Sequence, residues 1–318
     1  MSPSPHGSLF LHPVDLRLKF TRGATENSAY RFAIVLMIVS SVGFSLNGLI
    51  VRSLEEATPW QILFWRGAGV FFSQSMVLVY VYRRGLFTQL LHIGRWGLVA
   101  SLLNGCSPVG FFFALAHTTV ANVVFLMSAM PFVSAIMARL VLGERIHRTT
   151  LLAIPVAFIG IAVMVGGSIL AGAWLGNLFA ALTVLNFSVF VVILRYSRAR
   201  NMQPVLVLGG LVAMVFASVV SAGAVMVSLH DLLLCFVLGC VITGFGHLLF
   251  MQAAQILPAG EVTFLMLIEF VLAPLWVWVF VDEVPRASTL LGGGIVLATV
   301  AGWAFYRLRV PVEIKLPR

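Results

Sequence analysis

The chain has 318 residues, of which 60% are hydrophobic and only 10% are charged. Soluble domains carry roughly 25% charged residues, so this composition excludes a soluble globular protein. The formal net charge of +9 is what basic cytoplasmic loops give a membrane protein, and we expect no nucleic-acid partner. The long apolar runs lack the alternation of barrel strands, which predicts an all-α integral membrane protein embedded in a lipid bilayer.

Ten apolar runs follow one another along the chain. Residues 1–31 are polar and basic and predict a cytoplasmic N-terminal tail, and residues 308–318 predict a C-terminal one. Crossing a bilayer takes about 20 apolar residues, so we predict ten transmembrane helices between the tails. Their predicted bounds are 32–51, 60–82, 96–116, 120–142, 151–169, 175–194, 205–229, 232–253, 262–281 and 289–306.

The basic residues are distributed unevenly between the two sides of these helices. With the N-terminus inside, sixteen of the 20 Lys and Arg residues fall in cytoplasmic segments. Arg52 and Arg286 fall in outer loops, whereas Arg66 and Arg139 fall within helices. Because cytoplasmic loops collect Lys and Arg, this bias predicts a multi-pass protein of the plasma (inner) membrane with both termini cytoplasmic.

The sequence also repeats itself. A shift of 139 residues, without a gap, places 114–144 on 253–283, so that Glu144 meets Glu283. The two predicted repeats, 32–169 and 170–307, hold five helices each. Five is an odd number, so the second copy enters the membrane from the opposite side. Inverted repeats of this kind are typical of secondary transporters, which bind substrate near the membrane midplane between the halves.

One short motif closes the fourth predicted helix. Leu142-Gly143-Glu144-Arg145 stands there, and the next apolar run ends in Gly166-Gly167. With Arg66 in the second helix, these residues make the stretch 32–307 resemble the EamA type of the drug/metabolite transporter superfamily. The second copy, Val281-Asp282-Glu283, departs from the pattern by replacing Gly with Asp. The resemblance implies a permease for small organic solutes, with helices one, three, four, six, eight and nine around a central cavity.

Three polar side chains are predicted to share one level of the cytoplasmic half. Glu269, His247 and Asn104 each lie about 9–12 Å deep at ~1.5 Å per residue. Ionisable groups at such depth usually face a cavity or a partner. A carboxylate beside an imidazole can bind an amine or pass a proton. The alternative is a Glu–His hydrogen bond that only locks two helices together.

Arg66 and Asn47 are predicted at a comparable depth from the outer side. The planar guanidinium of Arg66 can hold a substrate carboxylate or phosphate. The alternatives are that Arg66 extends to the outer headgroups or pairs with Glu55 or Glu56.

Asn186, Ser128 and Gln252 complete the candidate site residues. Each is a small polar side chain within a predicted helix that can line the cavity. Such side chains also hydrogen-bond neighbouring helices without touching substrate, and that alternative stays open.

The sequence predicts a secondary transporter for small organic metabolites such as amino acids, with export the favoured direction and proton coupling an option. We expect no catalytic residue, cofactor or metal site, and the sequence leaves a homodimer open. Two alternatives are an intramembrane lipid-modifying enzyme and a non-transporting receptor or scaffold. An inverted repeat argues against both, because neither needs two-sided symmetry.

Overall fold

The computed structural model describes residues 26–82, 93–144, 146–165, 174–197, 202–282 and 287–309. All regular elements in these ranges are helical, as the composition predicted. The predicted tails, apart from their helical edges, lie outside the described residues, as do Gly166, Gly167 and Glu283.

In the described residues, the first half of the chain forms α2 (Glu26–Arg52), α3 (Pro59–Tyr82), α5 (Gly94–His117), α6 (Val120–Met127), α7 (Met130–Leu142) and α8 (Arg148–Val165). The second half forms α9 (Trp174–Tyr196), α10 (Pro204–Val220), α11 (Leu229–Val237), the π-helix η2 (Leu238–Phe245), α12 (Gly246–Ala254), α13 (Ala259–Leu265), α14 (Leu267–Val281) and α15 (Ala287–Arg309).

Among the residues that the structure describes, eight helical stretches are long and apolar enough to cross a membrane. Three of them combine consecutive elements: α6 with α7, α11 and η2 with α12, and α13 with α14. Two shorter apolar helices, Arg148–Met164 and Pro204–Val220, fall where the fifth and seventh crossings were predicted. The chain is therefore a multi-pass membrane protein, and the count of ten crossings stays a prediction.

The molecule presents apolar side chains outward. Tyr80, Leu140 and Val219 are 84%, 79% and 74% exposed, whereas the small polar Ser40 and Ser188 are fully buried. This distribution reverses that of a soluble protein, because lipid rather than water surrounds the outer surface.

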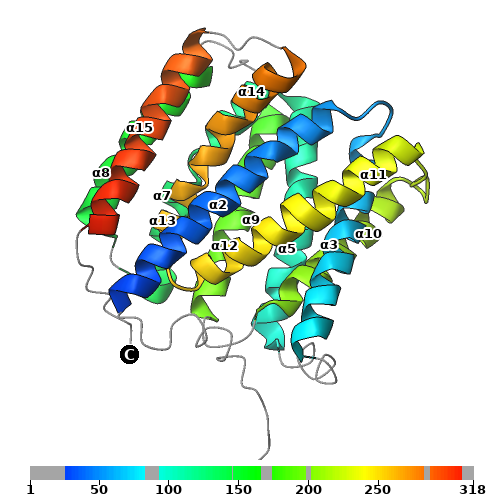
Figure 1. Cartoon of the computed structure of the whole chain (residues 1–318), viewed down its shortest axis with the longest axis horizontal. Coiled ribbons are helices and arrows are strands. Elements are labelled where there is room, and N and C mark those ends of the chain that lie inside the picture. Colours follow the sequence, from blue (N-terminus) through cyan, green and yellow to red (C-terminus); the bar gives the residue numbers. More distant parts are fainter. Residues whose placement is uncertain are drawn as a thin grey trace, which may run out of the picture.

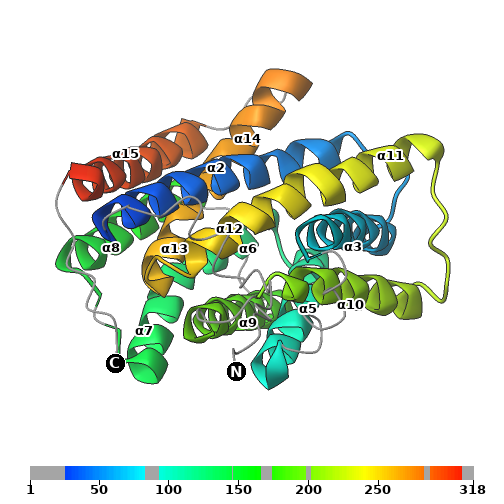
Figure 2. The ribbon, with the colours of Figure 1, turned by 60° about the horizontal axis from the view of Figure 1, so that its bottom comes forward.

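The helices form one elongated bundle, and α2 begins at the same end at which α15 ends (Figure 1). We call this the terminal end and the other the opposite end. At the two flanks of the bundle α3 packs on α10 and α8 packs on α15 (Figures 1 and 2). Between them α2 packs on α12 and α14, and α9 packs on α5, α6 and α7.

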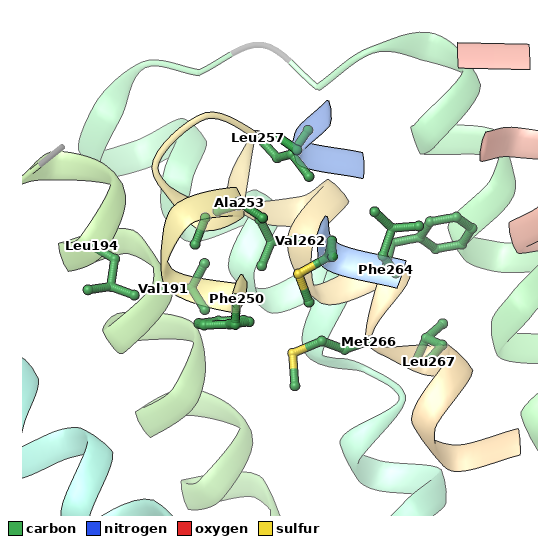
Figure 3. Packing of buried hydrophobic residues seen from close by; sticks show 14 of the residues in the cluster. Val191, Leu194, Phe250, Ala253, Leu257, Val262, Phe264, Met266 and Leu267 are labelled. Atoms are coloured by element: carbon green, nitrogen blue, oxygen red, sulfur yellow. The ribbon is translucent and has the colours of Figure 1, made fainter. Parts of the chain in front are cut away.

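The largest cluster of buried residues in the described part of the chain includes the place where α9, α12 and α13 meet. Val191 and Leu194 of α9 face Phe250 and Ala253 of α12 (Figure 3). The rings of Phe190 and Phe250 stack at 6.3 Å. This packing fixes the helices whose polar residues are described below.

Two crossings that the sequence presents as continuous apolar runs are broken near their middle. Ser128 and Ala129 separate α6 from α7, and Met266 separates α13 from α14. Pro131 lies in the first turn of α7 and lacks the N–H that would continue the ladder, which explains the first break. Under the 139-residue shift, residue 128 falls on 267, next to the second break.

The broken helices end alike. Gly143 caps α7 in the left-handed region at φ 66°, and Asp282 caps α14 there at φ 59°. The shift of 139 residues relates these two positions. The Asp that departs from the sequence pattern therefore adopts the backbone conformation of the Gly that it replaces.

Candidate functional site

Four polar side chains from four helices converge inside the bundle. Asn47 of α2 hydrogen-bonds the carboxyl group of Glu269 on α14, and Arg66 of α3 interacts electrostatically with that carboxyl group. His247 of α12 lies within electrostatic reach of Arg66. We call Asn47, Arg66, His247 and Glu269 the central cluster.

The positions of these four side chains in the structure differ in one respect from the membrane depths predicted by counting residues along the sequence. Glu269 and His247 were predicted in one half of the membrane, and Arg66 and Asn47 in the other. Helix α13 begins at Ala259, three residues before the predicted start, so Glu269 lies about 15 Å along its crossing, near mid-membrane. This shift brings the carboxyl group of Glu269 closer in depth to Arg66 and Asn47.

The imidazole of His247 is oriented by its own helix. Its Nδ1 lies 2.8 Å from the Thr243 carbonyl oxygen one turn earlier, so Nδ1 donates and Nε2 is the acceptor in the neutral ring. Thr243 belongs to the π-helix η2, a distortion that is frequent at functional sites. Phe44 and Phe250 contact the ring at centroid distances of 5.0 and 6.1 Å.

Aromatic side chains border the central cluster. Phe187 of α9 lies 5.8 Å from Phe250, which joins α9 to the His247 wall. Trp276 of α14 donates from Nε1 to Ser45 Oγ at 2.7 Å and ties α14 to α2 beside Glu269. The arrangement combines a cation, an acid and an imidazole with apolar walls, as small-molecule sites commonly do.

The other predicted residues lie apart from these four. Asn104 faces α10, since a Cβ added at Gly209 would meet its amide. Ser128 is buried at the α6–α7 break and donates to the Phe125 carbonyl at 2.6 Å. Gln252 is exposed on α12. Their roles as site residues stay predictions.

Asn186 of α9 is half-buried. Among the described residues, no donor reaches its Oδ1 or that of Asn47. Two buried acceptors without protein donors are available to a ligand that donates hydrogen bonds.

Sequence reasoning missed a second polar network at the terminal end. Glu261 of α13 accepts hydrogen bonds from Tyr30 at 2.5 Å, Thr150 at 3.1 Å and Arg307 at 2.9 Å. Arg307 also donates to the Tyr30 hydroxyl at 2.8 Å. These residues were assigned to tails and loops because the predicted helices stopped short of them. The longer observed helices bring them inside.

A further ion pair lies at the same end. Arg195 of α9 donates to Glu144 at 2.5 Å and to the carbonyl oxygens of Gln255 and Ile256 at 2.6 and 2.7 Å. The acid of the Leu142-Gly143-Glu144-Arg145 motif thus joins the end of α7 to the end of α9 and to the loop before α13.

A small pocket separates the two networks. Glu144 and Glu261 both line it, along with Ala135, Ala138 and Gly260. His147 also borders it, and burial together with the nearby Arg307 charge lowers the pKa of His147. In the described part of the chain, no three His, Cys, Asp or Glu side chains gather closely enough to hold a metal ion.

Comparison with known proteins gives three findings. Residues 31–166 match the model of the EamA-like transporter family. The chain is 26% identical over 278 residues to the pseudopaline exporter CntI of Pseudomonas aeruginosa (strain UCBPP-PA14), covering 84% of this chain and 94% of that protein. A solved crystal structure aligns with a TM-score of 0.70 over 87% of this chain and 99% of its own, at 15% identity, which shows a shared fold.

The matched residues contain the motif that first suggested the resemblance, since Glu144 and Arg66 both lie within 31–166. The alignment with the exporter covers 84% of this chain and 94% of the exporter, so the similarity is not confined to one half of the chain. Residues 31–166 therefore form an EamA-like domain of a membrane transporter, and the chain as a whole is similar to transporters of the drug/metabolite superfamily.

Proposed function

We propose that this transporter is a secondary carrier that exports small organic metabolites, such as amino acids or related solutes. The observation that carries the proposal is the central cluster, in which Arg66 and Glu269 from different helices lie within electrostatic range of each other inside an apolar bundle. Charged groups within a bilayer are costly and mark substrate or ion pathways.

The chemistry of the cluster favours an amphoteric solute. Arg66 offers a planar donor fork for a carboxylate. Glu269 and the open acceptor Oδ1 of Asn47 suit an ammonium group. An amino acid carries both groups, and its binding replaces the mutual attraction of Arg66 and Glu269 by two new pairs.

The packing of helices supports two inverted five-helix repeats. Exchanging the halves turns the α2–α14 contact into the α9–α7 contact, and the α2–α12 contact into the α9–α5 contact. The α3–α10 and α8–α15 contacts each map onto themselves. This exchange is what a pseudo-two-fold axis produces, and the odd number of helices in each predicted repeat places that axis in the membrane plane. Around such an axis two halves can expose a central site to either side in turn.

The basic residues support an orientation in the plasma (inner) membrane with the terminal end in the cytoplasm. Export then means uptake at the terminal end and release at the opposite end. The relative is named an exporter, which supports this direction.

Glu269 and His247 are the groups proposed for proton coupling. A carboxyl group that is neutral in one state and paired in another can link proton movement to solute movement. The charge of Arg66 acts on both Glu269 and His247. A substrate carboxylate bound to Arg66 would neutralise part of that charge and so change the electrostatic environment of Glu269 and His247.

A thermal-shift screen followed by flux tests the proposal. Purified protein in nanodiscs is heated with a panel of amino acids, their amine-only analogues and their acid-only analogues. A ligand that binds only the folded state at 100 times its Kd adds about 2.7 kcal/mol of stability. We expect amphoteric solutes to raise the melting temperature most and to show saturable counterflow in proteoliposomes. Stabilisation by neither amphoteric nor singly charged solutes would contradict the proposal.

A further inference from the structure

The inner halves of the two broken crossings meet in a tight seam at the terminal end. Ser134 of α7 and Thr263 of α13 share a hydrogen bond of 2.6 Å between their hydroxyl groups. A Cβ added at Gly260 would lie 2.8 Å from the Cβ of Ala135. Helices α7 and α13 therefore touch backbone to backbone, with no room for a solute between them.

Glu261 fastens one side of this seam. Its carboxyl group is 2% exposed and accepts from Tyr30 of α2, Thr150 of α8 and Arg307 of α15. The indole of Trp303 donates to the same Thr150 hydroxyl at 3.1 Å. We call these five residues the Glu261 latch. It joins α13 to α2, α8 and α15, which are far apart in the sequence.

Glu144 and Arg195 fasten the other side. The pair joins the end of α7 to α9, and Arg195 also holds the carbonyl oxygens of the loop that leads into α13. We call this the Glu144 latch. The pocket between the two latches is lined by residues of both, so the latches flank one and the same seam.

The corresponding seam at the opposite end is not closed. The 139-residue shift relates α7 to α14 and α13 to α6, yet within the described residues α6 and α14 do not pack closely against each other. Ala138 is 2% exposed, whereas Val277, its counterpart, is half-exposed. Ser134 is fully buried and its counterpart Ala273 is half-exposed. One sequence pattern thus adopts two packings, closed at the terminal end and loose at the other.

We propose that the Glu261 latch and the Glu144 latch hold shut a gate at the terminal end, and that both must release for the central cluster to become accessible from that end. The inference rests on the proposed transport function. Release of the seam between α7 and α13 is accompanied by packing of α6 on α14, because the two seams are equivalent in the repeat. The latches set how often the gate opens.

Maleimide labelling in nanodiscs, where both ends are accessible, measures the gate without any solute. The three native cysteines, Cys106, Cys235 and Cys240, are first replaced by Ala. One reporter is then Ala138→Cys at the terminal seam, and the other is Val277→Cys at the opposite seam. We expect Glu261→Gln to speed labelling of Ala138→Cys about tenfold or more. The variant loses a charge-assisted contact that is present only in the closed state, so the equilibrium shifts toward the open state. Labelling of the second should slow.

Glu144→Gln should act in the same direction. Thr150→Val removes the hydrogen bonds of Thr150 with Glu261 and Trp303 but no charge, so it should act more weakly. Gln74→Leu is the matched control, because it removes a buried interhelical bond to the Gly244 carbonyl at 2.8 Å, away from both latches. It should leave both labelling rates unchanged.

The opposing change at the two reporters is the decisive result. If the latches only stabilise the fold, the variants will speed labelling at both reporters or at neither, and the gate is refuted. Should Glu261→Gln fail to fold, Glu144→Gln and Thr150→Val decide by the same criterion. Absence of solute flux in the parent protein would refute the transport proposal alone, since labelling needs no solute.

Discussion

Arg66 and Glu269 show how far single residues can be interpreted from sequence. Each stands out as a charge within an apolar run, so each could be picked as a site residue. Their partnership could not be predicted, because depth counted along straight helices ignores tilt and the earlier start of α13. Glu269 is the carboxyl group that acts electrostatically on Arg66, which favours an inward-facing Arg66 over one that pairs with Glu55 or Glu56.

Substitution of Arg66 tests the binding role at the residue scale. We expect Arg66→Ala to abolish the rise in melting temperature produced by an amphoteric ligand. Arg66→Lys should keep part of it, because a Lys retains the charge but not the planar fork. Gln74→Leu should respond to ligand like the parent protein. An undiminished ligand response in Arg66→Ala would show that the substrate carboxylate binds elsewhere.

His247 permits a separate test of proton coupling. We expect His247→Phe to fold, because the Phe ring can keep the contacts with Phe44 and Phe250. It removes the titratable nitrogen, so the pH dependence of counterflow should shift or flatten relative to the parent protein. Flux measured in proteoliposomes from pH 5 to pH 8, in roughly half-unit steps, provides the comparison. A pH profile identical to that of the parent would limit His247 to an aromatic packing role.

At the scale of the helix, the glycines explain contacts that the sequence only suggested. The run Gly292-Gly293-Gly294 lies within α15, where small residues favour close packing against a neighbouring helix. A Cβ at Gly292 would lie 2.3 Å from the Gly160 carbonyl oxygen, whereas one at Gly294 meets nothing within 4 Å. Close packing therefore explains Gly292 and gives no reason for Gly294.

This contrast supplies a matched pair of variants. Gly292→Ala should lower the melting temperature, since overpacking between α15 and α8 costs about 1–3 kcal/mol. Gly294→Ala should be neutral or slightly stabilising, because Ala favours a helix over Gly by up to about 1 kcal/mol. Thermal unfolding of both variants in nanodiscs is the measurement. Equal stability of the two would mean that α8 and α15 approach less closely than described.

The helix ends carry another part of the fold that only the structure could supply. From the sequence, Asp282 in place of Gly was a departure from the motif. At φ 59° it adopts the same left-handed cap as Gly143, a conformation that Asp tolerates better than most residues. The repeat therefore extends to the backbone conformation of its caps, although the residue differs.

Exchanging the caps tests this equivalence. Gly143→Ala should destabilise the protein by about 1–2 kcal/mol, the cost of a Cβ in the left-handed region. Asp282→Gly should leave the melting temperature unchanged or raise it, because Gly adopts this conformation without strain. If Gly143→Ala proves harmless, the end of α7 does not need the left-handed cap.

For the whole molecule, composition was enough to predict a helical membrane protein, and the family motif was enough to predict a transporter. The internal breaks at Ser128 and Met266 could not be foreseen, because hydropathy does not change across them. The unequal packing of the two seams could not be foreseen either. A repeat gives both halves the same sequence pattern, and only tertiary contacts distinguish a closed seam from a loose one.

The central claim is that solute crosses the bilayer through a site built around Glu269. The most direct test is counterflow of an amphoteric solute in proteoliposomes, comparing the parent with Glu269→Gln at equal reconstituted density. Gln keeps a hydrogen-bonding group next to Asn47 but not the charge next to Arg66, so we expect a folded protein that has lost counterflow or its dependence on pH. Counterflow at the parental rate with the parental pH profile would reduce Glu269 to a contact between helices and contradict this account.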